Sequence, residues 1–236
     1  CFTIMKNILL TFLFIISFNQ LRAQYHEMGL FIGSSNYIGD IGSDFYIMPT
    51  NPAIGLIYKW NLTTRYSLRF SAINTSLKAN DYRTNDLNRF RRAYSFENNL
   101  TEGSIGIEIN FFDFNLHEEE TYFSPYIYFG GSFIRFNEFY FNSSMIPVAK
   151  PIDYQKGESF SIPIIFGIKT NPSPYWVLGL EIGARYALTD NLDGSSPNGD
   201  LIINSMSFGN ENNDWYIFSG ITISFTFGDL PCYCKE

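Results

Sequence analysis

The sequence predicts an all-β protein, an eight-stranded antiparallel transmembrane β-barrel with long extracellular loops and short periplasmic turns. Three observations support this fold class: an excess of aromatic residues, an alternation of apolar and small or charged residues in eight segments, and a strict alternation of long and short connections. Aromatic residues make up 18% of the chain, with 24 Phe and 16 Tyr. Phe and Tyr favour strands, and Tyr and Trp favour membrane interfaces, so this composition indicates an all-β or membrane-facing protein.

The first 23 residues resemble a secretory signal peptide. Lys6 precedes an apolar stretch from Ile8 to Phe18, and a short polar segment leads to Ala23. The apolar part is about half of the roughly 20 residues that a membrane-spanning helix requires, so we expect cleavage after Ala23, with a retained anchor helix as the alternative. Residues 1–23 are therefore predicted to be a signal peptide, with those before Met5 not translated.

Eight segments are predicted to be strands because their apolar residues recur with a period of two. In "WVLGLEIGARYAL" (176–188), every even position is apolar, while small residues, Glu181 and Arg185 occupy the odd positions. A helix would scatter the apolar set around its circumference, whereas a strand places it on one side. Pro163 lacks an amide donor, which predicts a bulge in the sixth segment. The predicted strands are 25–33, 53–60, 66–74, 94–112, 124–136, 158–169, 175–189 and 214–228.

The connections between these strands alternate in length. Those at 34–52, 75–93, 137–157 and 190–213 are long and polar, and those at 61–65, 113–124 and 170–174 are shorter. This parity is typical of outer-membrane barrels, whose extracellular loops are long and whose periplasmic turns are short. A soluble lipocalin-like barrel is the alternative, but it would face its apolar side chains inward. We therefore expect a barrel over 24–228 in the outer membrane, with both termini periplasmic.

An eight-stranded barrel is only wide enough to be filled by its own side chains, so a conducting pore is not expected. On the lipid face a central Arg or Lys would cost about 2–4 kcal/mol, so the charged residues of the strands are assigned to the lumen. There they can pair into a network that fills the interior. The predicted interior network consists of Glu27, Lys59, Arg69, Glu108, Lys169, Glu181 and Arg185.

The charge pattern gives little support for nucleic-acid binding, because the net charge is −7 and no run of Lys or Arg is present. No arrangement of His, Ser and acid typical of a hydrolase can be recognised, so we expect no enzyme and no cofactor. A lipid-modifying barrel enzyme that uses His26 beside Glu27 is the alternative. His117 lies in an acidic turn with Glu118, Glu119 and Glu120, which we interpret as a solvated face, with a protein contact as the alternative.

Two of the predicted loops carry clusters of charge. Asp190, Asp193 and Asp200 lie in "TDNLDGSSPNGD", which lacks the oxygen spacing of an EF-hand, so an ordinary polar loop is expected rather than a calcium or other metal site. Arg89, Arg91 and Arg92 would face lipopolysaccharide phosphates in this topology.

The C-terminal segment 229–236 is predicted to be a periplasmic tail that contains Cys232 and Cys234. The periplasm is oxidising, and two cysteines separated by one residue are poorly placed to pair with each other in an extended chain. An intermolecular disulfide to a partner is the working hypothesis, and a strained local disulfide or free thiols are the alternatives.

Nearly the whole mature chain resembles the PorG-like outer-membrane barrels of the type IX secretion system in the Bacteroidetes. The resemblance rests on "EMGLFIGSSNYIGDIG", "NPAIGLIYKWNLTTRYSLR", "RAYSFENNLTEGSIGIEINFF", "SPYIYFGG", "EIGARYALTDNLDGSS", "NDWYIFSGI" and the cysteine-containing tail. "EIGARYALTDNLD" is its most specific part, although Asn191 and Gly194 stand where an aromatic residue and a second acid are expected.

The resemblance implies a non-enzymatic secretion component that anchors a periplasmic ring, built from a lipoprotein and its partner protein, to the outer membrane. The partner contacts would then lie on the periplasmic turns and the tail, with Cys232 and Cys234 as the first candidates. A small structural or adhesive barrel that acts through its extracellular loops is the alternative.

Overall fold

The computed structural model describes residues 25–42, 49–116, 120–142, 151–197, 205–209 and 212–228. Within these residues no helix has both the length and the apolar character needed to span a membrane. Almost all of the regular structure in the described residues is β, and the exceptions among them are the single-turn 3-10 helix η2 (Asp81–Arg83) and the short helix α2 (Leu87–Arg92).

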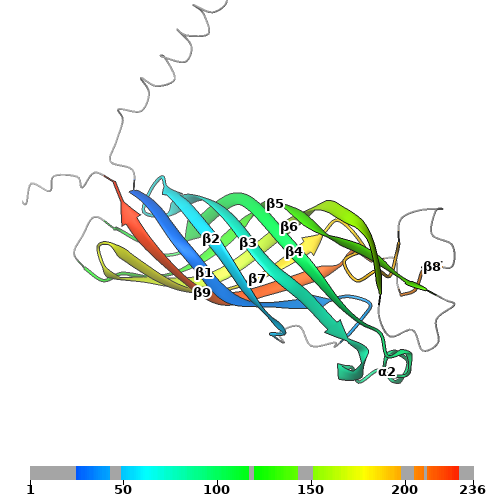
Figure 1. The fold of residues 1–236 in the computed structure, drawn as a ribbon. Helices are drawn as coiled ribbons and strands as arrows, with labels where there is room; N and C mark the ends of the chain where they lie inside the picture. The colour runs from blue at the N-terminus through cyan, green and yellow to red at the C-terminus, as the bar shows by residue number, and fades with distance from the viewer. Residues whose placement is uncertain are drawn as a thin grey trace, which may run out of the picture.

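Eight long strands form one closed antiparallel barrel, as predicted (Figure 1). Sequence neighbours pair with each other, the first strand pairs with the last, and a pairing between the fourth and fifth strands completes the ring. An additional two-residue strand, β8 (Ser205–Met206), pairs with the end of the fifth strand. The barrel strands are β1 (Tyr25–Ile38), β2 (Asn51–Asn61), β3 (Tyr66–Asn80), β4 (Ser95–Asn110), β5 (Phe123–Asn142), β6 (Ile152–Ser173), β7 (Trp176–Ala187) and β9 (Trp215–Phe227).

The outer wall of the barrel is apolar, and its side chains alternate in exposure along each strand. In β7, Leu178 and Leu180 are exposed, whereas Val177, Glu181 and Arg185 point inward and are buried. This arrangement is the reverse of that in a soluble barrel, because the apolar side chains face the surroundings. An outward apolar band around a closed barrel is the surface that a bilayer requires, because closure gives every strand two neighbours and leaves no free sheet edge in the band.

The two ends of the barrel differ. His26 pairs with Phe227, so both ends of the barrel chain lie at one end, named here the terminal end. At that end the connections are 62–65, 111–122 and the two-residue turn at Pro174 and Tyr175. The opposite end, named here the loop end, carries the long connections and α2 (Figure 1).

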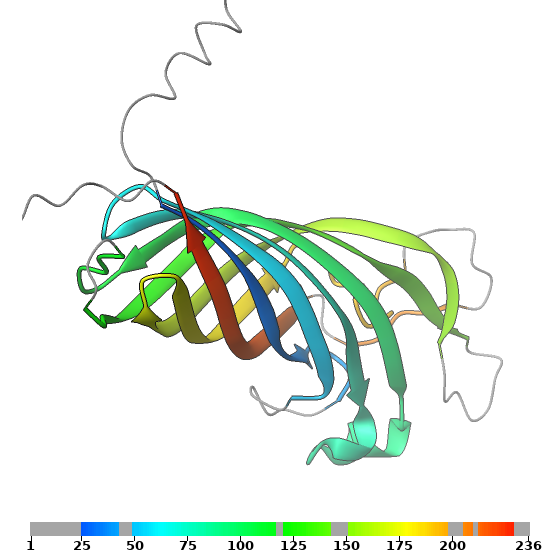
Figure 2. The same cartoon turned by 60° about the vertical axis from the view of Figure 1, so that its left-hand side comes forward.

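Several strands continue farther toward the loop end than the sequence pattern predicted. β5 and β6 extend through 137–142 and 152–157, which were expected to be loop, and β3 continues to Asn80 (Figure 2). The outward side chains of these extensions are polar and pair across strands, as Lys78 does with Glu97 at 2.9 Å. Polar cross-strand pairs stabilise a sheet outside the membrane without apolar alternation, which is the pattern used to define the strand ends.

The predicted bulge at Pro163 is wrong. The register between β5 and β6 is the same on both sides of Pro163, and the shift occurs instead between Glu138 and Phe139. The missing amide of Pro163 is accommodated by a local gap in pairing opposite Gly130 and Gly131, so no extra residue is inserted.

Candidate functional site

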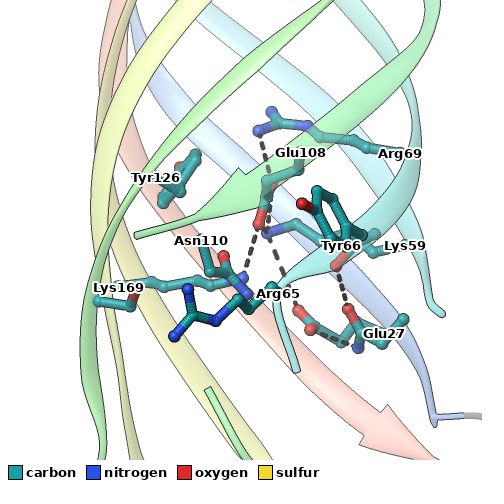
Figure 3. A network of polar contacts seen from close by, with 12 residues as sticks. Glu27, Lys59, Arg65, Tyr66, Arg69, Glu108, Asn110, Tyr126 and Lys169 are labelled. Atoms are coloured by element: carbon teal, nitrogen blue, oxygen red, sulfur yellow. Dashed lines mark hydrogen bonds and ion pairs between the residues drawn. The ribbon is translucent and has the colours of Figure 1, made fainter. Parts of the chain in front are cut away.

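The lumen contains a polar network centred on Glu108 of β4 (Figure 3). Lys59 of β2 lies 2.9 Å from both carboxylate oxygens of Glu108, and Lys169 of β6 lies 2.7 Å from Oε1. Arg69 of β3 approaches Oε2 at 3.5 Å. These side chains are almost completely buried, so Glu108 is compensated by three cations rather than by water.

Arg69 also forms the most complete ion pair of the lumen. Its Nη1 and Nη2 donate to Oε2 and Oε1 of Glu181 at 2.8 and 2.9 Å, which is the bidentate geometry that guanidinium and carboxylate favour. Tyr126 Oη donates a further hydrogen bond to Glu181 at 2.8 Å. The guanidinium of Arg69 also lies 5.1 Å from the centre of the Tyr128 ring. This group of contacts joins β3, β5 and β7 across the lumen.

Arg185 of β7 pairs with Glu102 of β4, a residue that was not among the predicted interior set. The Nε–Oε1 distance is 3.5 Å, and Tyr216 Oη donates to Glu102 Oε2 at 2.6 Å. The guanidinium of Arg185 lies 4.2 Å from the centre of the Phe218 ring. Glu102 has the same parity as Glu108 in β4, so the alternation that assigned Glu108 to the lumen also predicts Glu102.

Glu27 of β1 completes the set at the terminal end. Asn61 donates to Glu27 Oε1 at 2.8 Å, and Lys59 lies 4.0 Å from Oε2. All seven predicted interior residues are therefore buried in the lumen and lie in contact with one another or with Glu102. With Glu102 included, this network, named here the lumen network, has four cations and four carboxylates, so its formal charge is zero.

The described parts of the connection between β4 and β5, residues 111–116 and 120–122, cover the terminal end of the lumen. Its Phe114 and Leu116 are buried against Val177, and Phe114 lies beneath the Lys169 ammonium, 4.7 Å from ring centre to Nζ. Asn171 fixes the returning chain by accepting from the Tyr122 amide at 2.6 Å. An apolar layer thus separates the lumen network from the solvent at this end.

The loop-end half of the barrel is filled by an apolar cluster that the sequence pattern did not predict. It contains inward side chains of several strands, such as Phe31, Leu77, Phe136 and Phe218. Leu192, in the connection after β7, packs onto the cluster. Asn98 Nδ2 donates a hydrogen bond to the Leu192 carbonyl at 2.8 Å. The lumen is therefore occupied by ion pairs toward the terminal end and by rings and aliphatic chains toward the loop end.

Two carboxyl groups lie beneath the loop-end connection. Asp214 accepts hydrogen bonds from Tyr37 Oη and from the Leu192 amide, and Asp193 accepts from the Ser195 amide at 2.9 Å. Burial, together with the neighbouring Asp40, raises the pKa of Asp193, and burial together with Asp193 raises the pKa of Asp214 well above its usual range.

These carboxyl groups are not arranged as a metal site. In the part of the chain that the structure describes, no group of three or more His, Cys, Asp or Glu side chains is placed to hold a metal ion. Of the three acids in the "TDNLDGSSPNGD" loop, Asp190 and Asp193 are described and Asp200 is not.

The remaining candidate residues lie elsewhere. His26 is stacked among Tyr58, Trp60 and Phe227 on the outer wall, and its Nδ1 lies 2.9 Å from Tyr58 Oη. Arg92 is bound to Asp81 at 2.8 Å and to the Asp40 carbonyl at 2.7 Å, so it holds the β3–β4 connection together. Arg91 is exposed. The signal segment, His117, Glu118, Glu119 and the tail with Cys232 and Cys234 lie outside the described residues.

A closed eight-stranded ring, an outward apolar band and a charge-compensated lumen define a β-barrel protein of the outer-membrane class. The sequence profile of the family described as "Domain of unknown function (DUF6089)" matches residues 6–236, so the chain belongs to this family. No curated protein matches the chain.

Solved outer-membrane barrels show a distant likeness. Neisserial surface protein A (NspA) has a TM-score of 0.45 at 11% identity, covering 88% of this chain and 100% of that one. The N-terminal barrel domain of Pseudomonas aeruginosa OprF has a TM-score of 0.44 at 14% identity, covering 87% and 100%. Ail, the attachment invasion locus protein of Yersinia pestis, has a TM-score of 0.43 at 10% identity, covering 87% and 100%. We draw no functional conclusion from them.

Proposed function

We propose that this barrel is a non-enzymatic outer-membrane component of the type IX secretion system, which anchors a periplasmic ring of a lipoprotein and its partner protein. The resemblance of the mature chain to the PorG-like barrels supports this role. The lumen network also supports an anchor, because ion pairs and packed rings occupy the space that a transport path would need. His26 lies among aromatic rings on the outer wall, where it suits an interfacial position better than catalysis.

The observation that carries the proposal is the shared position of the chain ends and the turns. His26 pairs with Phe227, so the described part of the barrel chain begins and ends at the terminal end, where the connections 62–65 and 111–122 also lie (Figure 1). A terminal end in the periplasm would present the tail cysteines and three turns to the ring proteins on one surface. The exposed Arg65 and Asp113 lie on this surface and form a bidentate pair.

The tail and its cysteines can be tested separately. Cells would carry either the full chain, a chain that ends at Gly228, or the double variant Cys232→Ser, Cys234→Ser. We expect pull-down from detergent extracts to recover the ring proteins with the full chain, to lose them with the truncated chain, and to lose only a covalent adduct on non-reducing gels with the double variant. A heat-induced mobility shift on gels is the control that the barrel is folded and inserted.

The opposite outcome would favour a barrel that acts through its loops. The structure offers one specific feature for that role, since Tyr82, Leu87 and Phe90 are exposed on the β3–β4 connection, Leu87 by 70%. If the truncated chain retains the ring proteins and secretion, the anchor role of the tail is overturned. If, in addition, Leu87→Ser with Phe90→Ser abolishes a cell-surface interaction, the loop-centred role is the correct one.

A further inference from the structure

A hollow opens on the outside of the barrel at the loop end, separate from the lumen. It has a volume of about 560 Å³ and lies between the end of β1, helix α2, the end of β7 and the start of β9. A hollow of this size is in the range of sites for small organic ligands. We name it the rim pocket; its polar and aromatic lining residues are Asp40, Arg89, Tyr186, Asn212, Asn213 and Trp215.

Two aromatic rings form one wall of the rim pocket. Tyr186 and Trp215 are directly paired in the register of β7 and β9, and their ring centres are 4.9 Å apart. Trp215 is 41% exposed. Asn213 Nδ2 donates to Tyr186 Oη at 2.9 Å, and this hydrogen bond holds the Tyr186 ring in its position in the wall. The rings alone would be an ordinary aromatic belt at a membrane interface, so the ligand preference of the pocket depends on what lies opposite them.

Hydrogen-bond donors and acceptors line the side of the rim pocket opposite the two rings. Arg89 brings a guanidinium from α2 and is held by the carbonyls of Gly39 and Gly42 at 3.3 and 3.4 Å. Asp40 also lines the pocket, although it is largely buried, and Asn212 supplies an exposed amide that both donates and accepts. The pocket therefore combines an aromatic surface with donors and acceptors that face the same space.

This combination selects among ligand chemistries. A purely apolar ligand would remove Arg89 and Asn212 from water without replacing their hydrogen bonds, which is costly. A simple anion could pair with Arg89 but would leave the two aromatic rings of the wall without a partner. A sugar ring fits both sides, because its hydroxyl groups donate and accept at once while its C–H face packs on an aromatic ring.

We propose that the rim pocket binds a saccharide, namely the sugar headgroup of a glycolipid in the outer leaflet. The level of the pocket argues for this source. Trp215 and Tyr186 stand at the water edge of the apolar band, where Trp and Tyr settle in membrane barrels and where the sugars of a glycolipid lie. The assignment of the leaflet rests on the orientation given under the proposed function, whereas the saccharide chemistry does not.

Binding can be measured by calorimetry on the full chain folded in detergent micelles. Three probes are compared. The first is the oligosaccharide of lipopolysaccharide without its acyl chains, the second is the same oligosaccharide after its phosphate groups are removed, and the third is inorganic phosphate alone. We expect both oligosaccharides to bind and inorganic phosphate not to bind. Trp215→Leu should weaken binding about tenfold, since it keeps an apolar side chain but removes the ring. Asn212→Ala, at an exposed position, should weaken it severalfold.

Trp176→Leu is the matched control, because Trp176 is an outward Trp in a cross-strand pair with Phe225 at the terminal end. It should bind both oligosaccharides like the unmodified chain. Unchanged binding in both Trp215→Leu and Asn212→Ala, an equal loss in Trp176→Leu, or binding of inorganic phosphate in place of the dephosphorylated oligosaccharide would overturn the proposal. The rim pocket lies at the loop end, opposite the end of β9 at Phe227, so failure here would leave the pull-down result on the tail unaffected.

Discussion

Arg69 and Glu181 are joined by two hydrogen bonds of 2.8 and 2.9 Å across the lumen, although their strands, β3 and β7, are not neighbours in the barrel. Backbone pairing alone therefore does not account for the way these strands face each other. Both side chains are buried, so the pair has lost its water and depends on its geometry for compensation. Such a pair fixes the lumen in one arrangement, but whether it adds net stability depends on what replaces it.

The first prediction concerns that pair. Arg69→Met should lower the free energy of unfolding by about 3–5 kcal/mol. The buried Glu181 carboxylate would lose its cation, and Glu108 would keep only two of its three. The loss would be measured by urea unfolding in detergent micelles, with the heat-induced mobility shift on gels as the readout of the folded fraction.

The double variant Arg69→Met, Glu181→Gln separates charge compensation from packing. It removes one cation and one carboxylate together, and the amide oxygen introduced by Glu181→Gln can still accept from Tyr126. We expect it to recover most of the lost stability. If the double variant is as unstable as Arg69→Met, the pair contributes by packing and not by charge.

The strand parity explains how much of the lumen was predictable. A period of two places Glu27, Glu108, Glu181 and Arg185 on one side of their strands. That side must be the inner one, because a charge on the lipid-facing side of a membrane strand is costly. The partners were not predictable, because Arg69 and Glu181 are far apart in sequence and strands that face each other across a lumen leave no local pattern.

The apolar half of the lumen was missed for a related reason. Phe31 and Phe218 share the parity of inward residues, but an apolar residue type in a membrane strand by itself predicts the lipid face. The strand extensions were missed because residues outside the bilayer lose the apolar alternation. Composition thus predicted the class of fold, while the packing inside it depends on pairings distant in sequence.

The second prediction concerns the contact between β4 and β5. Gly106 and Gly130 face each other, and a Cβ on Gly106 would lie 2.2 Å from the Phe129 carbonyl oxygen. Gly106→Ala should therefore destabilise the barrel by about 1–3 kcal/mol, as overpacking does. Gly103→Ala, on the outer face of the same strand, is the matched control, since its Cβ would meet no atom within 4 Å. Equal stability of the two variants in urea would contradict the close approach.

The third prediction locates the membrane on β4. Ile105 is outward and exposed within the apolar band, so Ile105→Lys should cost about 2–4 kcal/mol in a bilayer. Asn99 is outward on the same strand, in the extension whose outward groups are polar, so Asn99→Lys should cost about 1 kcal/mol or less. Reversible unfolding from lipid vesicles would measure both. Similar costs for the two variants would show that the membrane edge is placed incorrectly.

The fourth prediction concerns pH at the loop end. Burial and like-charged neighbours raise the pKa of both Asp193 and Asp214, so the folded connection 190–197 favours their protonated forms. The two protonated carboxyl groups contribute fully to the stability of this connection below the ordinary carboxyl pKa of about 4, and this contribution is lost as the pH rises through their raised pKa values.

The variant Asp193→Asn tests this pH dependence, because its side chain is permanently neutral. At pH 7 it should increase the free energy of local opening by roughly 1 kcal/mol, the equivalent of about one pKa unit. Hydrogen exchange of 191–197, corrected for the intrinsic pH dependence, should slow severalfold and vary less with pH. Glu97→Gln, at an exposed loop-end position, should change neither quantity, and faster exchange in Asp193→Asn at pH 7 would show that the carboxylate form is the one that the fold favours.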